Sequence, residues 1–319
     1  MTTTAERLEG ARGEPAPLRA HGLGAYLVCF TGIVWREVLR FLHQRERFFS
    51  ALVRPLVWLF IFAAGFRQVL GVSIIPPYES YVLYETFVTP GLVGMILLFN
   101  AMQSSLSMVY DRETGAMRTL LVSPFPRSFL LLSKLLGGVA VAMLQVYAFL
   151  AVAYFWEIEP GGSPLNLGFG SIPAPWNGYI TVLPALILAG LMLGALALFM
   201  SSVIRQLENF AGVMNFVIFP MFFASSALYP LWRIKESSPL LETICRLNPF
   251  TYAVELIRFA MYGKIGPVVE DPATGATHLD LTNLYVVIGC TILFLAAAIY
   301  AYNPSKGLIG RRGGPGGGG

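Results

Sequence analysis

Three polar side chains share one face of an otherwise apolar stretch. Asn100, Gln103 and Ser107 follow the spacing i, i+3 and i+7, which places them on one side of a helix. Amide and hydroxyl groups in this pattern can hydrogen-bond an amphiphilic molecule that passes along the helix. They can equally join neighbouring helices through hydrogen bonds worth about 0.6–2 kcal/mol each. The sequence leaves both interpretations open.

A second candidate surface combines an amide with aromatic rings. Asn215 is followed at helical spacing by Phe219 and Phe222, on either side of Pro220. A weakly polar, aromatic surface suits an amphiphilic cargo, and helix packing is again the alternative. We therefore predict a substrate pathway lined by Asn100, Gln103, Ser107, Asn215, Phe219 and Phe222.

The sequence contains no recognisable catalytic or nucleotide-binding motif. A phosphate-binding GxxxxGK[ST] loop is absent, because Gly263-Lys264 is followed by Ile265 and no glycine-rich loop precedes it. The HExxH and GxSxG motifs are also absent, and the three histidines and three cysteines are scattered. We expect no enzyme activity, no bound cofactor and no metal ion in this chain.

The composition indicates where these residues work. Of 319 residues, 55% are hydrophobic and 13% are charged, and the mean hydropathy is +0.64. The charged fraction is about half that of an average soluble domain. It argues against a soluble enzyme, a disordered chain and an ordinary nucleic-acid-binding domain. The remaining class is an all-α polytopic membrane protein.

Six continuously apolar runs approach or exceed the roughly 20 residues that a helix needs to cross the hydrocarbon layer. They occupy residues 55–70, 90–109, 135–156, 179–204, 210–232 and 281–302. Arg67 interrupts the first run, and we expect its side chain to reach the membrane interface. The central parts of the runs lack Asp and Glu, which weakens the hypothesis of an ion-coupled carrier.

The distribution of lysine and arginine predicts the orientation. The side that holds both termini has 16 of the 22 bases but only 8 of the 18 acids, so the positive-inside rule makes it cytoplasmic. Segments 72–89, 157–178 and 233–280 would then face outside. Residues 1–25 and the Gly-rich residues 304–319 are expected to be disordered cytoplasmic tails that flank a membrane domain at 26–303.

Two cytoplasmic segments are amphipathic and too polar to span. Residues 26–49 place Arg36 and Arg40 opposite an apolar, aromatic face, which predicts a helix in the inner membrane interface. This helix is either a simple anchor or a lever. Residues 113–121 predict a short helix that Pro124 and Pro126 end, and this helix is either a docking element or a plain connector.

The stretch before the last apolar run is too apolar for a hydrated loop. Pro230, Pro239 and Pro249 cut it into pieces that are too short to span. Broken backbone cannot face lipid, so we predict two short re-entrant helices that pack against protein near the outer face. Residues 264–280 are expected to form a solvated loop.

The order of these features resembles the permease subunits of type-2 ABC exporters, a class that includes nodulation-factor, daunorubicin-type drug and O-antigen polysaccharide exporters. The resemblance covers about residues 25–303. It rests on Asp111-Arg112-Glu113-Thr114-Gly115, Leu120-Leu121-x-x-Pro124, Pro230-Leu231, Leu247-Asn248-Pro249-Phe250-Thr251-Tyr252 and Arg258.

The resemblance implies an export permease in the bacterial inner membrane. It would pair with a second copy or a paralogous permease, and a separate cognate ATPase subunit would hold ATP and Mg. It implies ATPase coupling through Asp111, Arg112, Glu113, Gly115, Arg118, Leu120, Leu121 and Pro124, and an outer gate at Pro230, Asn248, Pro249, Tyr252 and Arg258. An ion-gradient-driven carrier and a non-transporting membrane scaffold are the alternatives.

Overall fold

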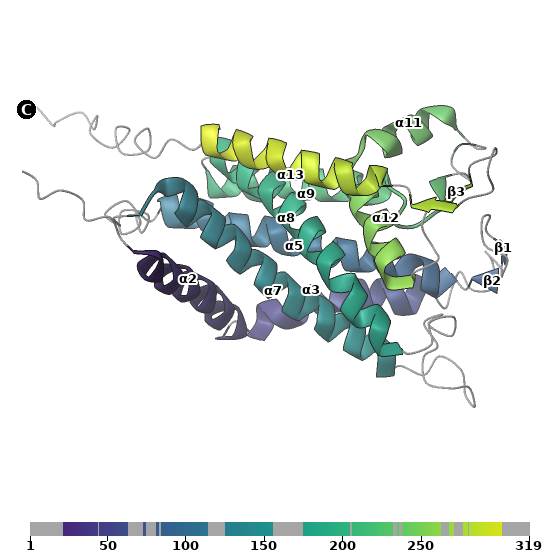
Figure 1. Cartoon of the computed structure of the whole chain (residues 1–319), viewed down its shortest axis with the longest axis horizontal. Helices are drawn as coiled ribbons and strands as arrows, with labels where there is room; N and C mark the ends of the chain where they lie inside the picture. The colour runs from purple at the N-terminus through teal and green to yellow at the C-terminus, as the bar shows by residue number, and fades with distance from the viewer. Residues whose placement is uncertain are drawn as a thin grey trace, which may run out of the picture.

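Long apolar helices form a bundle (Figure 1). The computed structural model describes residues 22–43, 45–62, 73–74, 81–82, 84–113, 125–155, 175–204, 206–231, 235, 238–262, 268–270, 277–279 and 281–301. Within these described residues, four helices are long and apolar enough to cross a membrane: α5 (Tyr84–Glu113), α7 (Arg127–Phe155), α8 (Pro175–Val203) and α13 (Thr282–Ala301). The prediction of a helical polytopic membrane protein is confirmed.

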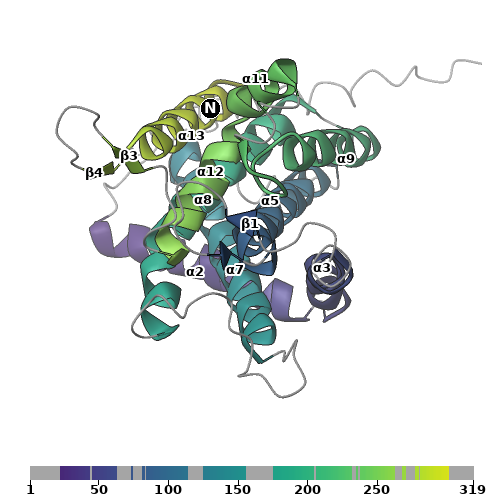
Figure 2. The same ribbon diagram turned by 90° about the vertical axis from the view of Figure 1, so that its right-hand side faces the viewer.

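Helix α8 lies at the centre of the bundle and contacts α5, α7, α12 and α13. The buried core is built mainly from apolar side chains of α5, α7, α8, α9 and α12. A small residue lets α7 approach α8, because a Cβ atom at Gly194 would collide with the side chain of Leu135. In Figure 2, which looks along the bundle, α3 and α9 lie at the periphery while α5 and α8 lie inside.

The N-terminal region forms two helices where the sequence predicts one. Helix α2 (Leu23–His43) begins inside the predicted tail, and α3 (Arg45–Val57) continues into the first predicted span. Pro55 lies within α3 and removes one backbone hydrogen bond, and the π-helix η1 (Trp58–Phe62) follows it directly. The rest of the predicted span, residues 63–70 with Arg67, lies outside the described residues.

Helix α9 (Leu207–Phe223) is shorter than the predicted span at 210–232. At the end of α9, the hydroxyl of Ser225 takes the place of backbone hydrogen bonds. It donates to the carbonyl of Phe222 and accepts from the backbone N–H of Ala227. Residues 224–230 therefore have no regular secondary structure. With 17 residues, α9 falls below the length that a straight spanning helix needs.

Two short helices follow, as predicted, and meet at one asparagine. They are α11 (Pro239–Leu247) and α12 (Pro249–Tyr262). Ser238 caps α11 by accepting from Leu241 N–H, and a proline begins each helix, where its missing N–H costs nothing. Helix α12 packs against α5, α8 and α13.

Two antiparallel hairpins complete the described fold. Strands β1 (Ser73–Ile74) and β2 (Tyr81–Val82) pair in one, and β3 (Val268–Glu270) and β4 (Thr277–Leu279) pair in the other. The second hairpin lies in the segment that was predicted to be a loop, where Val268 and Val269 favour an extended backbone. Both hairpins lie with α11 at one end of the bundle, and the C-terminal end of α13 lies at the other (Figure 1).

Candidate functional site

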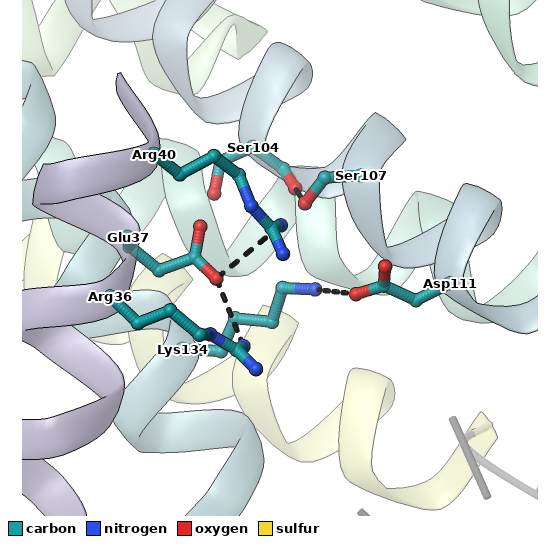
Figure 3. Close-up of polar contacts among 7 residues, drawn as sticks. All are labelled: Arg36, Glu37, Arg40, Ser104, Ser107, Asp111 and Lys134. Carbon is teal, nitrogen blue, oxygen red and sulfur yellow. Dashed lines mark hydrogen bonds and ion pairs between the residues drawn. The ribbon is translucent and has the colours of Figure 1, made fainter. Parts of the chain in front are cut away.

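A cluster of charged side chains joins α2, α5 and α7 (Figure 3). Its centre is Glu37 of α2, whose side chain is only 9% exposed. The Oε1 atom of Glu37 lies 3.2 Å from Arg36 Nη2 and 3.8 Å from Arg40 Nη1. One carboxylate therefore binds two guanidinium groups. Glu37 lies on the buried face of α2, which the sequence pattern assigns to apolar residues.

The second ion pair of the cluster lies at the end of α5. Lys134 Nζ of α7 donates to Asp111 Oδ2 at 3.1 Å, and the two side chains are 7% and 15% exposed. A largely buried pair of this kind holds its helices in a fixed register, because separating the charges would leave each without a partner. The last turn of α5 is thereby anchored to α7.

Two adjacent glycines of α7 create the space for this cluster. A Cβ atom at Gly137 would lie 3.3 Å from Glu37 Cγ, and one at Gly138 would lie 2.8 Å from Ser104 Oγ. The glycine pair therefore brings α2 close on one side and α5 on the other. A small cavity remains between the three helices, lined by Glu37, Arg40, Phe41, Asn100, Ser104, Ser107, Gly138 and Val141.

The predicted polar face of α5 is engaged mainly within the protein. Asn100 is buried and its amide donates to Gln145 Oε1 of α7. Ser107 Oγ donates to the backbone carbonyl of Ser104 at 2.7 Å, and Gln103 is half-buried. For Asn100 this geometry matches the helix-packing interpretation. Asn100 and Ser107 also line the small cavity beside Glu37.

The predicted aromatic surface of α9 is divided between two faces. Phe222 points into the core, where its ring contacts those of Trp58 and Phe250. Asn215 is exposed, and Phe219 is 46% exposed and stacks on Phe223. The exposed face of α9 therefore carries Asn215 and Phe219 but not Phe222.

At the other end of the bundle, Asn248 connects the end of α9 to α12. Its Nδ2 atom donates to the backbone carbonyls of Met221 and Ala224, both at 2.7 Å, and its Oδ1 accepts from Phe250 N–H at 3.0 Å. The next residue, Pro249, begins α12. One side chain thus satisfies two carbonyls at the end of α9 and caps the following helix.

Tyr252 and Arg258 extend this connection. Tyr252 donates through its hydroxyl to the carbonyl of Arg246 in α11 at 2.8 Å. Arg258 is 2% exposed, pairs with Glu255, donates to the carbonyl of Ser226 at 2.8 Å, and lies 4.1 Å from the ring centre of Phe87. We call Asn248, Tyr252 and Arg258 the outer cluster. Pro230 lies half-buried at the end of the irregular segment that the outer cluster holds.

Helix α11 has one buried face and one exposed face. Cys245 is fully buried, and its burial raises the pKa of the thiol. The Cys245 carbonyl accepts a hydrogen bond from the hydroxyl of Thr251 at 2.7 Å, which ties α11 to α12. Leu240 and Leu247 on the opposite face are more than 70% exposed. Helix α11 is therefore attached to α12 through its buried side and through the Tyr252 hydroxyl of the outer cluster.

The predicted ATPase-coupling residues are described only in part. Asp111 pairs with Lys134, as above, and the carboxylate of Glu113 accepts from the backbone N–H of Leu207 at 2.8 Å. Arg112 lies in α5 between them. The other predicted coupling residues lie outside the described part of the chain: Gly115, Arg118, Leu120, Leu121 and Pro124.

Sequence reasoning missed Glu37, Lys134 and Gln145. Each is polar and sits in a helix whose neighbours are apolar, and each is buried in the structure. A usable signal for Glu37 was its position between two arginines, at i−1 and i+3 on the same helix. The adjacent glycines Gly137-Gly138 were the signal for close helix approach.

Comparison with known proteins identifies related sequences. The ABC-2 type transporter family model matches residues 29–262. The putative transport permease ycf38 of Pyropia yezoensis is 26% identical over 235 residues, which cover 73% of each chain. Nodulation protein J of Rhizobium leguminosarum bv. trifolii is 23% identical over 250 residues, 78% of this chain and 83% of that protein. The probable multidrug ABC transporter permease YbhR of Escherichia coli (strain K12) is 27% identical over 184 residues, 57% of this chain and 45% of that protein.

Proposed function

The chain belongs to the ABC-2 type transporter family, and we propose that it is the membrane-spanning permease subunit of an ATP-driven exporter. The sequence lacks a phosphate-binding loop, so a separate cognate ATPase subunit would hold ATP and Mg. The single observation that carries the proposal is the family match over residues 29–262, which includes the segment after α5 and the outer cluster. This permease itself would bind no cofactor.

Energy would enter through the segment that follows α5. The last turn of α5, which precedes this segment, is firmly attached, because Asp111 is paired with Lys134 and Glu113 is bonded to α9. This attachment supports the proposal that residues 114–124 form a docking element. A force that a partner applies to a firmly attached element moves the helices joined to it, whereas the same force on a loose loop would only bend the loop. Helix α2 would act as the second lever, because it packs along α7, where Gly137 lies against the side chain of Glu37.

The substrate pathway would lie beside α9, between two permease chains. Phe216 is 78% exposed and Phe219 46% exposed on the same helix as the exposed Asn215. A second copy of this chain or a paralogous permease would cover that face. Asn215, Phe219 and the half-buried Gln103 would contact an amphiphilic cargo, while Asn100 and Phe222 support the helices from within.

The outer cluster would form the outer gate. Asn248, Tyr252 and Arg258 attach α11 and α12 to the end of α9, so a movement of α9 reaches both short helices. Following the charge distribution, the α5–α7 connection and both termini would face the cytoplasm of a bacterial cell, and α11 and the two hairpins would face outside.

The test is to co-express the chain with candidate ATPases and purify it. We expect a stable complex whose ATP hydrolysis is faster than that of the ATPase alone. An ion gradient applied to vesicles that hold the chain alone should drive no transport. Transport by the chain alone, or failure to associate with any ATPase encoded beside its gene, would contradict the proposal.

A further inference from the structure

Helix α9 receives its N-terminal cap from a distant helix. Its own N-cap residue, Gln206, has an extended backbone (φ −95°, ψ 134°) but makes no side-chain cap. The Gln206 side chain instead accepts a hydrogen bond from Asn209 Nδ2 at 2.6 Å. Glu113 Oε1 accepts from the N–H of Leu207, the first residue of α9, at 2.8 Å. The cap thus comes from the last residue of α5, 94 positions earlier in the chain.

The first turns of α9 have one buried side and one exposed side, and Phe210 on the buried side is fully enclosed in the core. Glu208 and Asn209 are exposed, and no atom outside the local helix lies within 4 Å of a Cβ atom placed on Gly212. Among the described elements, α5 is the one against which α9 packs most extensively. The bond from Glu113 is therefore a specific polar attachment at an end of α9 that is otherwise held by the apolar packing of Phe210.

The end of α5 that carries Glu113 is itself attached to α7. Asp111, two residues before Glu113, is paired with Lys134 of α7. The segment that begins at residue 114 follows Glu113 directly in the chain. The last turn of α5 is therefore the described part of the chain that adjoins this segment, and the Glu113 carboxylate bonds that turn to α9.

We propose that Glu113 is a positioning residue that transmits movement of the segment after α5 to α9. This inference rests on the proposed function, in which an ATPase displaces that segment and α9 borders the pathway. It assigns the Glu113 carboxylate a role inside the permease, as the acceptor of the Leu207 N–H bond, rather than a charge contact with the ATPase.

Two readouts on the full chain in lipid nanodiscs test the proposal. Hydrogen–deuterium exchange of residues 207–210 reports the cap without any partner. Co-purification with the ATPase and the stimulated rate of ATP hydrolysis report association and coupling. If the wild-type chain neither binds nor stimulates an ATPase, the proposed function fails, whereas the exchange measurement still tests the bond.

Three variants separate the possible roles of Glu113. Glu113→Ala removes the acceptor, so exchange at 207–210 should rise about fivefold, the effect of losing a helix cap. Hydrolysis should then fall to the unstimulated rate while the ATPase still co-purifies. Glu113→Gln keeps a carbonyl acceptor and should retain most of both signals. The double variant Glu113→Ala/Gln206→Asp supplies a local cap, so exchange should return to within about twofold of wild type but stimulation should stay lost.

Glu208→Gln is the matched control. It removes one negative charge from the first turn of α9 but leaves the hydrogen bond between Glu113 and the Leu207 N–H in place. It should leave stimulation unchanged and raise exchange less than Glu113→Ala does, because an exposed first-turn carboxylate interacts only weakly with the helix dipole. The proposal is overturned if Glu113→Ala and Glu113→Gln both lose ATPase binding, which would indicate a charge contact with the partner. It is also overturned if the local cap restores stimulation, or if Glu113→Ala changes neither readout.

Discussion

At the scale of single residues, the buried charges of the described helices are paired, either within one helix or across two. Lys134 and Asp111 form such a pair, and Glu37 holds Arg36 and Arg40. The sequence revealed the apolar surroundings of these residues but not their partners. Lys134 and Asp111 are 23 positions apart, and their contact depends on how α5 and α7 are docked. Pairing between helices is set by packing that no local spacing encodes.

The Lys134–Asp111 pair gives the first prediction. Asp111→Asn leaves the lysine buried without its carboxylate and should lower the free energy of unfolding by about 3 kcal/mol. The double variant Lys134→Met/Asp111→Leu removes both charges and should recover most of that loss. Thermal unfolding in detergent measures both. Equal destabilisation by the single and double variants would show that the pair is not the source of the stability.

Asn248 gives the second prediction. Asn248→Asp keeps the acceptor for Phe250 N–H but cannot donate to the carbonyls of Met221 and Ala224. We expect it to detach α9 from α12 nearly as fully as Asn248→Ala. The readout is maleimide labelling of the buried Cys245, with Cys29 and Cys290 replaced by serine.

Labelling of Cys245 should be slow in the parent chain and several-fold faster in both Asn248 variants. Because burial raises the pKa of this thiol, less thiolate is present at neutral pH, and labelling of the parent should increase up to a higher pH than for a free thiol. Slow labelling in Asn248→Asp would contradict the role assigned to the two donated bonds.

At the scale of elements, continuous apolar runs predicted α5, α7, α8 and α13 well. The errors occurred where a local interaction overrides hydropathy. Helix α9 ends at Phe223 because the Ser225 hydroxyl competes for backbone groups, although the apolar run continues. Helix α3 continues through Pro55, the residue at which the sequence predicted a new segment to begin. Helix boundaries are decided by single hydrogen bonds that composition does not register.

The third prediction concerns the contact of α5 with α7. Gly138→Ala places a Cβ atom against Ser104 Oγ and should destabilise the protein by about 1–3 kcal/mol, the usual effect of overpacking. Adding Ser104→Ala removes the hydroxyl and should recover more than half of the loss. Denaturation midpoints measure both variants. If the second substitution brings no recovery, the packing of the two helices differs from the geometry described.

At the scale of the whole molecule, the two ends of the bundle differ in charge and in structure. The end that is predicted to be cytoplasmic carries most of the lysine and arginine and the α5–α7 connection, and the other end carries α11 and both hairpins. The sequence alone predicts this polarity, because the positive-inside rule depends on counts rather than contacts. It was insufficient for the pathway, because Asn215 and Phe222 share helical spacing yet face different surroundings.

The most direct test of the central claim is the accessibility of the connection after α5. Arg118→Cys, in a chain whose three native cysteines are replaced by serine, is exposed to a membrane-impermeant maleimide in inverted inner-membrane vesicles and in right-side-out vesicles. We predict labelling in the inverted vesicles alone, and protection from labelling when the ATPase subunit is bound. Labelling from the outer side, or labelling that the bound ATPase does not reduce, would contradict the account of a permease moved by a partner at this segment.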